Sequence, residues 1–180
     1  ADFDAHGWPD IFVAVDGMAN HLWMNRADGT FIDRALLAGA AYNAEGMPEA
    51  GMGVSAAVFV DDGDEDILVA NLTGEHNTLY VNDGTGYFDD RTLAHNLGTM
   101  SLPYTGFGLS WFDAEGDGDL DFFVANGDVK VVEAFADQEY PYANPSQLVR
   151  NLGAPLYRFE DVSAQAGEAV TRPTVPRRAC

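Results

Sequence analysis

At 180 residues, with 47% hydrophobic and 12% aromatic side chains, the chain is long enough to bury one core, and its composition excludes general disorder. The 29 acidic against 9 basic side chains give a net charge of −20, which excludes nucleic acids and anionic membranes as partners and suits cations. No run of about 18 apolar residues occurs, so the sequence predicts no membrane span.

An acidic loop at residues 2–10 opens the chain and runs directly into an apolar strand at residues 11–15. The same unit returns at residues 58–66 and at residues 113–121, each time followed by an apolar strand. The last aspartate of the unit stands at positions 10, 66 and 121, so the spacings are 56 and 55 residues. A fixed period of this length predicts a repeat architecture.

Other strands are predicted with the same period. Glycine-rich segments precede the second and third loops, at residues 51–55 and 106–110. They predict a first strand that approaches a neighbour closely, because glycine has no side chain to keep the two backbones apart. After the loop and its strand, a third strand is predicted at residues 20–25, 77–82 and 146–151. A short fourth strand, beyond a hairpin turn, is predicted at residues 31–33, 88–90 and 159–161.

Four short antiparallel strands per period predict an all-β fold of β-propeller blades, whereas the rungs of the rival β-solenoid are much shorter. The blades are expected at about 1–34, 51–92 and 106–163, the first of them lacking its first strand. Three blades do not close a ring of about four to eight. We therefore expect part of a larger propeller, or self-association in which the tail at 164–180 supplies a strand that completes a blade. The single cysteine, Cys180, allows no internal disulfide.

The third acidic loop has the spacing of a calcium site. Calcium takes about six to eight oxygen ligands, which a tightly turned loop supplies from alternate carboxylates and a backbone carbonyl. Magnesium would use fewer protein ligands and more water, so the pattern favours Ca²⁺. The expected ligands are Asp113, Glu115, Asp117, Asp121 and, through its carbonyl, Asp119.

The other two loops depart from this pattern. In the first loop His6 replaces an oxygen ligand, which predicts weaker binding; the remaining ligands there are Asp2, Asp4, Asp10 and the carbonyl of Trp8. In the second loop valines replace the first two carboxylates, so we expect a degraded, empty site; the carboxylates left are Asp62, Asp64 and Asp66. The alternative for all three loops is a plain acidic β-turn, since Asp-Gly is a common turn pair.

With loops, strands and glycines in register, the chain resembles the FG-GAP/VCBS repeat family, the blade type of the integrin alpha head. Within it, the chain is most similar to the group of cartilage acidic proteins and ASPIC/UnbV-associated proteins. The resemblance is carried by recurring phrases over nearly the whole chain, such as residues 106–108, 117–127, 77–82 and 159–163. It implies calcium in the turn between the first two strands of a blade. It also implies export to a secreted, extracellular or periplasmic location and a role in adhesion or recognition, often on seven blades.

The function expected from the sequence is a calcium-binding, non-catalytic module that recognises a protein or glycan ligand. A long insertion between residues 126 and 148 is expected to be either a short helix that caps the blade edge or a recognition loop, because long loops on a rigid scaffold often carry binding residues. Its candidate ligand-binding residues are Asp128, Phe135, Tyr140 and Tyr142. Two alternatives remain open from the sequence: a carbohydrate-active propeller enzyme, whose paired carboxylates would cut glycosidic bonds, and a structural unit that only assembles.

Overall fold

The computed structural model describes residues 1–129 and 141–174, and these form three antiparallel sheets in chain order. The first sheet consists of β1 (Ile11–Val13), β2 (His21–Asn25) and β3 (Phe31–Asp33). The second consists of β4 (Gly53–Ala57), β5 (Asp66–Ala70), β6 (Thr78–Asn82) and β7 (Phe88–Asp90). The third consists of β8 (Thr105–Phe112), β9 (Asp121–Gly127), β10 (Gln147–Asn151) and β11 (Phe159–Asp161).

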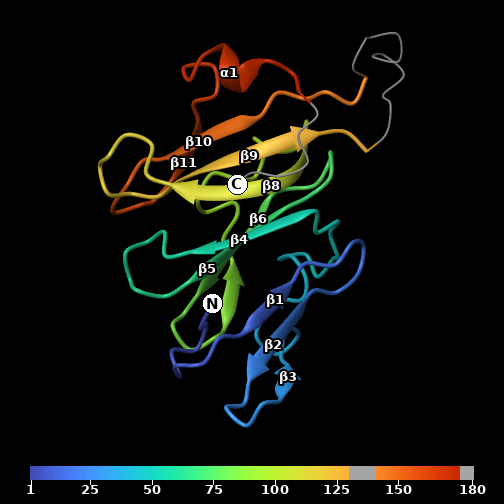
Figure 1. Ribbon diagram of the computed structural model, residues 1–180, viewed down its shortest axis with the longest axis vertical. Coiled ribbons are helices and arrows are strands. Elements are labelled where there is room, and N and C mark those ends of the chain that lie inside the picture. Colours follow the sequence, from blue (N-terminus) through green and yellow to red (C-terminus); the bar gives the residue numbers. More distant parts are fainter. Residues whose placement is uncertain (130–140, 175–180) are drawn as a thin grey trace.

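The predicted all-β fold is confirmed: each sheet is a meander of three or four short strands, as in a propeller blade. Strand β5 pairs with β4 and β6, and β9 pairs with β8 and β10, always antiparallel. The three sheets follow one another along the long axis of the molecule (Figure 1). In the part of the chain that the structure describes, no helix is long and apolar enough to cross a membrane.

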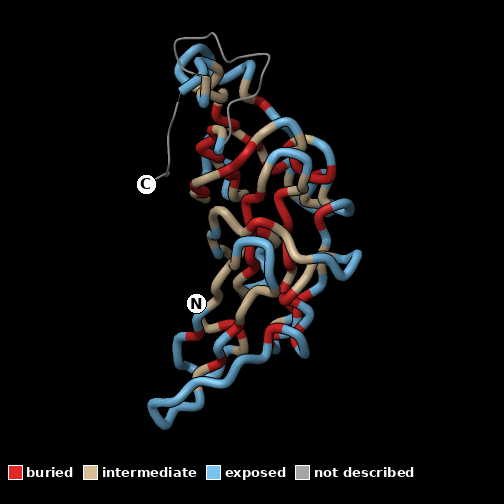
Figure 2. The backbone as a smooth tube through the Cα atoms, turned by 90° about the vertical axis from the view of Figure 1, so that its right-hand side faces the viewer, coloured by how far each residue is buried: buried red, intermediate tan, exposed pale blue. Residues whose placement is uncertain are grey.

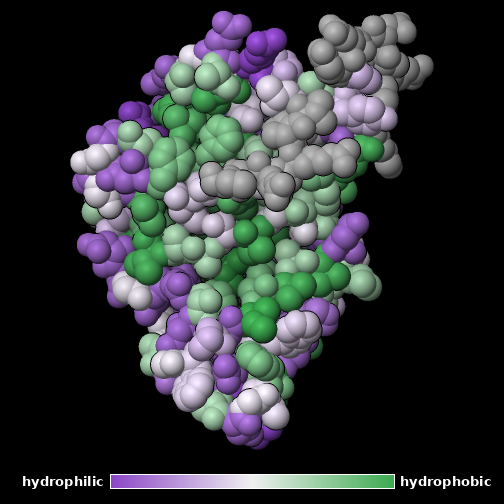
Figure 3. All heavy atoms as spheres, viewed as in Figure 1, coloured by the Kyte–Doolittle hydropathy of each residue, from purple (hydrophilic) through white to green (hydrophobic). Residues whose placement is uncertain are grey.

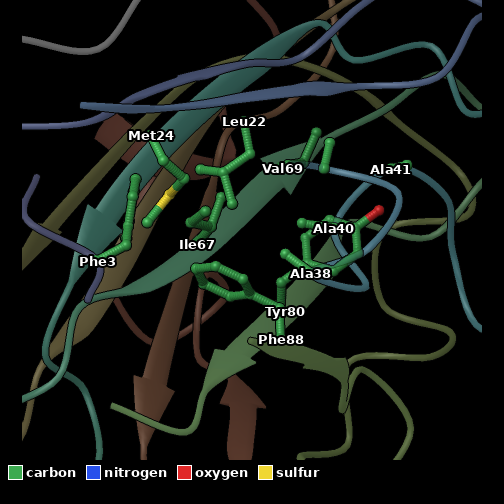
Figure 4. Close-up of a cluster of buried hydrophobic side chains, with 11 residues drawn as sticks. Phe3, Leu22, Met24, Ala38, Ala40, Ala41, Ile67, Val69, Tyr80 and Phe88 are labelled. Carbon is green, nitrogen blue, oxygen red and sulfur yellow. The ribbon is translucent and has the colours of Figure 1, made fainter. Parts of the chain in front are cut away.

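Two hydrophobic cores lie between consecutive sheets, because a central strand buries both of its faces. Alternate side chains of β5 point to opposite sides: Ile67 and Val69 pack toward the first sheet, and Leu68 and Ala70 toward the third. Figure 4 shows the core between the first two sheets, where Met24 of β2 and Ile67 of β5 belong to one buried cluster. Each large apolar side chain in these cores, such as Ile67 or Leu68, stabilises the fold by about 1.5–3 kcal/mol when it is fully buried.

Each sheet has a leading face and a trailing face. The leading face is the one on the side of the preceding sheet in chain order, and the trailing face is the one on the side of the following sheet. The leading face of the second sheet comprises Ile67, Val69, Tyr80 and Phe88. The leading face of the third sheet comprises Phe122, Val124, Val149 and Phe159. By strand position, the leading face of the first sheet comprises Ile11, Val13, Trp23 and Phe31.

The glycine-rich first strands come as close to a neighbour as their sequence predicts. A Cβ atom added at Gly53 on β4 would lie 2.7 Å from the carbonyl oxygen of Phe107 on β8. One added at Gly106 would lie 2.8 Å from the Cβ of Ala70. Any side chain there would force adjacent sheets apart, so glycine at these positions permits the stacking.

The tail departs from the expected strand. Glu168–Thr171 forms one helical turn, α1, and Val170 accepts a hydrogen bond from the backbone N–H of Ser146 at 3.2 Å. In the part of the tail up to Thr174, which the structure describes, only Thr174 makes a β-bridge, with Asn144. The turn is closed by local backbone hydrogen bonds, in which the N–H groups of Thr171 and Arg172 donate to the carbonyls of Gly167 and Glu168. Residues 175–180, including Cys180, lie outside the described residues.

Candidate metal centre

The last aspartate of every acidic loop joins two strands of its sheet. Buried Asp10 accepts a hydrogen bond from the backbone N–H of Asn25 at 2.7 Å. In the other two sheets Asp66 accepts from Asn82, and Asp121 from Asn151, each at 2.8 Å. The two partners are 15, 16 and 30 residues apart in sequence, yet the contact is the same. The last loop position thus holds the third strand in place, whether or not the loop binds a metal.

In the first loop four side chains gather. Single ligand atoms of Asp2, Asp4, His6 and Asp10 all lie within 4.8 Å of one another. Among residues 1–129 and 141–174 no other group of this kind occurs. One oxygen of Asp4, Oδ1, is buried and lies 2.5 Å from His6 Nδ1. Three carboxylates gathered around one imidazole repel one another, and a cation among them would offset that repulsion, so this group fits a metal ion.

Hydrogen bonds within the first loop set its charge. The Asp2 carboxylate accepts the backbone N–H of Gly7 at 2.7 Å, and His6 Nδ1 lies 3.1 Å from its other oxygen. Partial burial opposes ionisation of Asp2, but these hydrogen bonds outweigh it and lower its pKa. The same contact with Asp2 raises the pKa of His6, whose Nδ1 also lies 2.5 Å from Asp4. His6 therefore stands among the carboxylates as a partner for their charge.

The first loop is also fixed to the second sheet. The backbone N–H of Asp2 donates to Glu65 at 2.8 Å, and the side-chain amide of Asn82 donates to the carbonyl of Phe3 at 2.8 Å. An ion in this loop would therefore stiffen the junction between the first two sheets. The side chain of Trp8, the predicted carbonyl ligand, is exposed.

In the third loop no three carboxylates gather as they do in the first loop. Asp113 accepts the backbone N–H groups of Gly116 and Gly118 at 2.7 and 3.0 Å, and the bond from Gly118 chiefly lowers its pKa. Glu115 lies 3.7 Å from the Arg150 guanidinium, which also binds Glu160 at 2.8 Å. Partial burial raises the pKa of Glu115.

Two further ligands predicted for the third loop, Asp117 and Asp119, contact each other within the turn. Asp117 accepts the backbone N–H of Asp119 at 3.0 Å, a contact within the turn. Burial raises the pKa of Asp119, and the neighbouring charge of Asp117 adds to the rise. The loop that best matches the calcium pattern by sequence thus does not bring three of its carboxylates together as the first loop does.

The second loop keeps three carboxylates but does not gather them. Asp62 accepts the backbone N–H of Asp64 at 3.1 Å, which closes a local turn. Asp66 is fully buried, and burial, with the charges of Asp62 and Asp64, raises its pKa to about 7. The main contact of this loop is the hydrogen bond by which Asp66 holds the third strand of the sheet.

The predicted recognition loop is described only at its base. The backbone N–H of Asp128 donates to the carbonyl of Tyr142 at 2.9 Å, and the side chain of Tyr142 is exposed. Burial raises the pKa of Asp128. Phe135 and Tyr140 lie outside the described residues.

Sequence reasoning missed two kinds of residue at these loops. The asparagine that ends each third strand recurs at the same strand position, and this recurrence could have revealed its pairing with the loop aspartate; these residues are Asn25, Asn82 and Asn151. Arg150 carried a weaker signal, as a charged residue where the other two sheets have Met24 and Val81.

Comparisons with known proteins agree with this architecture. The model of the FG-GAP-like repeat family matches residues 59–124, which span the second and third acidic loops. Cartilage acidic protein 1 of Homo sapiens is 35% identical over 118 residues, and that of Xenopus tropicalis is 31% identical over 117 residues. Each alignment covers 65% of this chain but only 17% of the relative, so the chain spans a small part of the relatives' length.

Proposed function

Residues 59–124 are an FG-GAP-like repeat, as the recurring loops predicted, and on that premise we propose that the chain is a calcium-binding propeller segment of an extracellular recognition protein. Its role is to present a rigid surface to a protein or glycan ligand, without catalysis. Homology to cartilage acidic protein 1 supports a place among exported adhesion or recognition modules. The ion contributes rigidity, and the loops between strands contribute the binding surface.

The observation that carries the metal proposal is the group in the first loop. Three carboxylates and His6 have ligand atoms within 4.8 Å of one another, and His6 Nδ1 lies 2.5 Å from the buried Oδ1 of Asp4. Residues that would hold the ion are therefore Asp2, Asp4 and Asp10, with His6 at the rim. The ion would supply positive charge among three carboxylates that otherwise repel one another.

Calcium is the cation that we propose, because oxygen ligands from a short loop suit a hard ion with flexible coordination. His6 is also a ligand that zinc accepts, but the group contains no cysteine and is dominated by carboxylates. In the third loop Glu115 is turned toward Arg150, so we propose weaker binding there than in the first loop.

Titration of the metal-free protein with calcium, followed by calorimetry, tests the site. We expect binding at the first loop and a higher melting temperature, since a ligand at a hundredfold excess over its dissociation constant adds about 2.7 kcal/mol to the free energy of unfolding. A calcium chelator should reverse the rise. Parallel titrations with magnesium and zinc test the choice of metal.

Asp4→Asn is the matched variant, because it removes one ligand charge while keeping the shape of the side chain. Asp89→Asn is its control, since Asp89 is an exposed aspartate that pairs with Arg91 outside the loops. Calcium binding that is unchanged in Asp4→Asn, or absent below millimolar calcium, would contradict the metal proposal. Tighter binding of zinc than of calcium would overturn the choice of ion.

Screening the calcium-loaded protein against glycans tests recognition and catalysis together. Bound glycan without released reducing ends supports a recognition module. Release of reducing ends would instead show an enzyme and contradict the non-catalytic proposal.

A further inference from the structure

The first sheet leaves its leading face open, whereas the other two sheets bury theirs. On the second sheet Ile67, Tyr80 and Phe88 are 0%, 1% and 5% exposed. On the third sheet Phe122, Val149 and Phe159 are 1%, 1% and 0% exposed. At the same positions of the first sheet, Ile11, Trp23 and Phe31 are 42%, 37% and 45% exposed. Figure 2 shows this contrast along the molecule, with its lower end mostly exposed.

The side chains on this open face are those of an interface and not of a solvated surface. Positions that face solvent in an antiparallel sheet are usually polar, yet Ile11, Trp23 and Phe31 are large and apolar. Trp8, in the acidic loop that leads into β1, is a further exposed apolar side chain. In Figure 3 hydrophobic atoms gather over the area in which Figure 1 draws β1. A contiguous apolar patch of this kind marks an interaction site.

The edge of the first sheet is open as well. The second and third sheets each begin with a strand, β4 or β8, that lies beside the strand following the acidic loop. Among the strands that the structure describes, β1 pairs only with β2. The backbone N–H of Asp10 donates to the carbonyl of Ala1 at 2.6 Å, at the position where Phe112 pairs with Asp121 in the third sheet. This contact sets the register for a strand running along β1.

A hollow of about 250 Å³ adjoins the open face, and its lining includes His21, Asp33 and Leu37. In the second sheet the matching place is filled by the chain segment that connects the first two sheets. The backbone N–H of Ala44 in that segment donates to Asp90 at 2.8 Å. The loop that follows the fourth strand also reaches across each junction. The backbone N–H of Phe88 donates to the carbonyl of Ala38, and that of Phe159 to the carbonyl of His95.

From these repeated contacts we propose that the open face of the first sheet is a blade-docking surface whose occupant is another blade of the same repeat type. That blade presents an apolar trailing face, like that formed by Leu68, Ala70 and Leu79 of the second sheet. It covers Ile11, Trp23 and Phe31, and the strand that follows it pairs with β1. The proposal continues an interface that the chain already forms twice and is independent of metal binding.

A second copy of the chain is a poorer occupant than a further blade. The trailing face that a second copy offers is that of the third sheet, and the segment around α1 is attached there. Ser146 donates to Val170, and Asn144 pairs with Thr174 across that side. Two chains of net charge −20 also repel each other.

The test is a fusion in which a second copy of residues 51–111 is placed directly before Ala1. This copy carries a complete blade and most of a β8-type strand, and Ala1 then takes the position of Phe112. We expect Trp23 to become shielded from a soluble fluorescence quencher, and residues 11–33 to exchange their amide hydrogens at least tenfold more slowly. Trp23→Phe in the same fusion identifies the share of the signal that comes from Trp23. Equal quenching and exchange in the fusion and the chain would overturn the proposal.

Two double variants of the chain itself keep the proposal testable if the fusion does not fold. Trp23→Ser with Phe31→Ser changes the open face, and Tyr80→Ser with Phe88→Ser changes the same positions where a blade is docked. We expect the first pair to shift the melting temperature by less than about 2 °C and the second to abolish cooperative unfolding. Equal losses would show that the open face is already covered. Sedimentation of the unaltered chain as a dimer with Trp23 shielded would replace the further blade by a second copy.

Discussion

Single residues decide which acidic loop gathers its ligands. In the first loop the small side chains of Asp2 and Asp4 converge around His6. In the third loop the longer Glu115 lies 3.7 Å from the Arg150 guanidinium. The guanidinium is held by Glu160 as well, so it offers Glu115 a charge partner that does not depend on a metal. Loop spacing alone therefore does not rank the sites.

Changing His6 to aspartate should strengthen calcium binding. The His6→Asp variant places in the first loop the acid that the third loop has at Asp117, and added ligand charge raises calcium affinity. We expect about tenfold tighter binding by calorimetry, which corresponds to about 1.4 kcal/mol. His21→Asp is the control, because His21 pairs with Asp33 away from the loops. An affinity that falls in His6→Asp would show that His6 is itself a required ligand.

Glu49 makes the fold more stable in mild acid than at neutral pH. It is half-buried between the first two sheets, where its carboxylate accepts a hydrogen bond from Thr78 at 2.6 Å. Burial raises its pKa above the ordinary 4.5, and the charges of Glu75 and Asp90 add to the rise. A carboxyl group with a raised pKa binds its proton more readily in the folded state. Its contribution is therefore fully present below pH 4.5 and is lost as the pH rises above that value.

The Glu49→Gln variant should lose this part of the pH dependence. We expect it to be at least as stable as the unaltered chain at pH 7, because no charge is then buried, with the difference disappearing at pH 4. Urea unfolding at several pH values measures it. A variant that is less stable by the same amount at every pH would show that the charge itself has no role.

At the scale of the elements, each blade is held by an aspartate on one strand and an asparagine on another. Removing the acceptor leaves a buried backbone N–H unpaired, which costs about 1–3 kcal/mol. We expect Asp66→Ala to destabilise the metal-free protein by that amount, since Asp66 accepts from Asn82. Asp66→Asn should lose less stability, because the amide keeps an oxygen that can accept the hydrogen bond. It also removes a buried carboxyl group, whose pKa burial raises to about 7.

Chemical unfolding in a chelator-containing buffer measures both Asp66 variants without any contribution from bound metal. Equal stability of Asp66→Ala and the unaltered chain would show that water replaces the carboxylate at no cost.

Much of the fold could be predicted because the signal is periodic. The aspartates at 10, 66 and 121 and the glycines at 51 and 106 recur with the repeat, so loops and strands were placed from the sequence. The arrangement of ligands could not be predicted, since it depends on contacts between distant residues. Arg150 meets Glu115 across 35 positions of the chain, and no local pattern encodes that contact.

The tail shows a different limit of sequence reasoning. By the repeat period a strand was expected there, but the chain turns into α1 after Gly167, whose φ of 88° suits glycine. A period predicts where an element could begin, and local conformation decides which element forms.

At the scale of the whole molecule, charge opposes the stacking that the apolar cores favour. The three acidic loops contain 13 of the 29 acidic side chains, three in the first loop and five in each of the others. Contacts between the first and second loops, such as that of Asp2 with Glu65, bring these acids close together. Cations in the surrounding solution therefore contribute to stability even without a specific site.

Raising the ionic strength should consequently stabilise the metal-free protein. Between 0.01 M and 0.15 M salt the screening length falls from about 30 Å to about 8 Å, so repulsion between exposed carboxylates of different sheets is largely removed. We expect the melting temperature to rise by about 2–4 °C, which corresponds to roughly 1 kcal/mol for a chain of this size.

Calorimetric scans in sodium chloride and in tetramethylammonium chloride measure the effect, and the bulky second cation binds poorly in a carboxylate loop. An equal rise in both salts shows general screening of the net charge of −20. A rise in sodium chloride alone would assign the effect to cations bound in the loops, and no rise in either salt would mean that the acids are too far apart to repel one another.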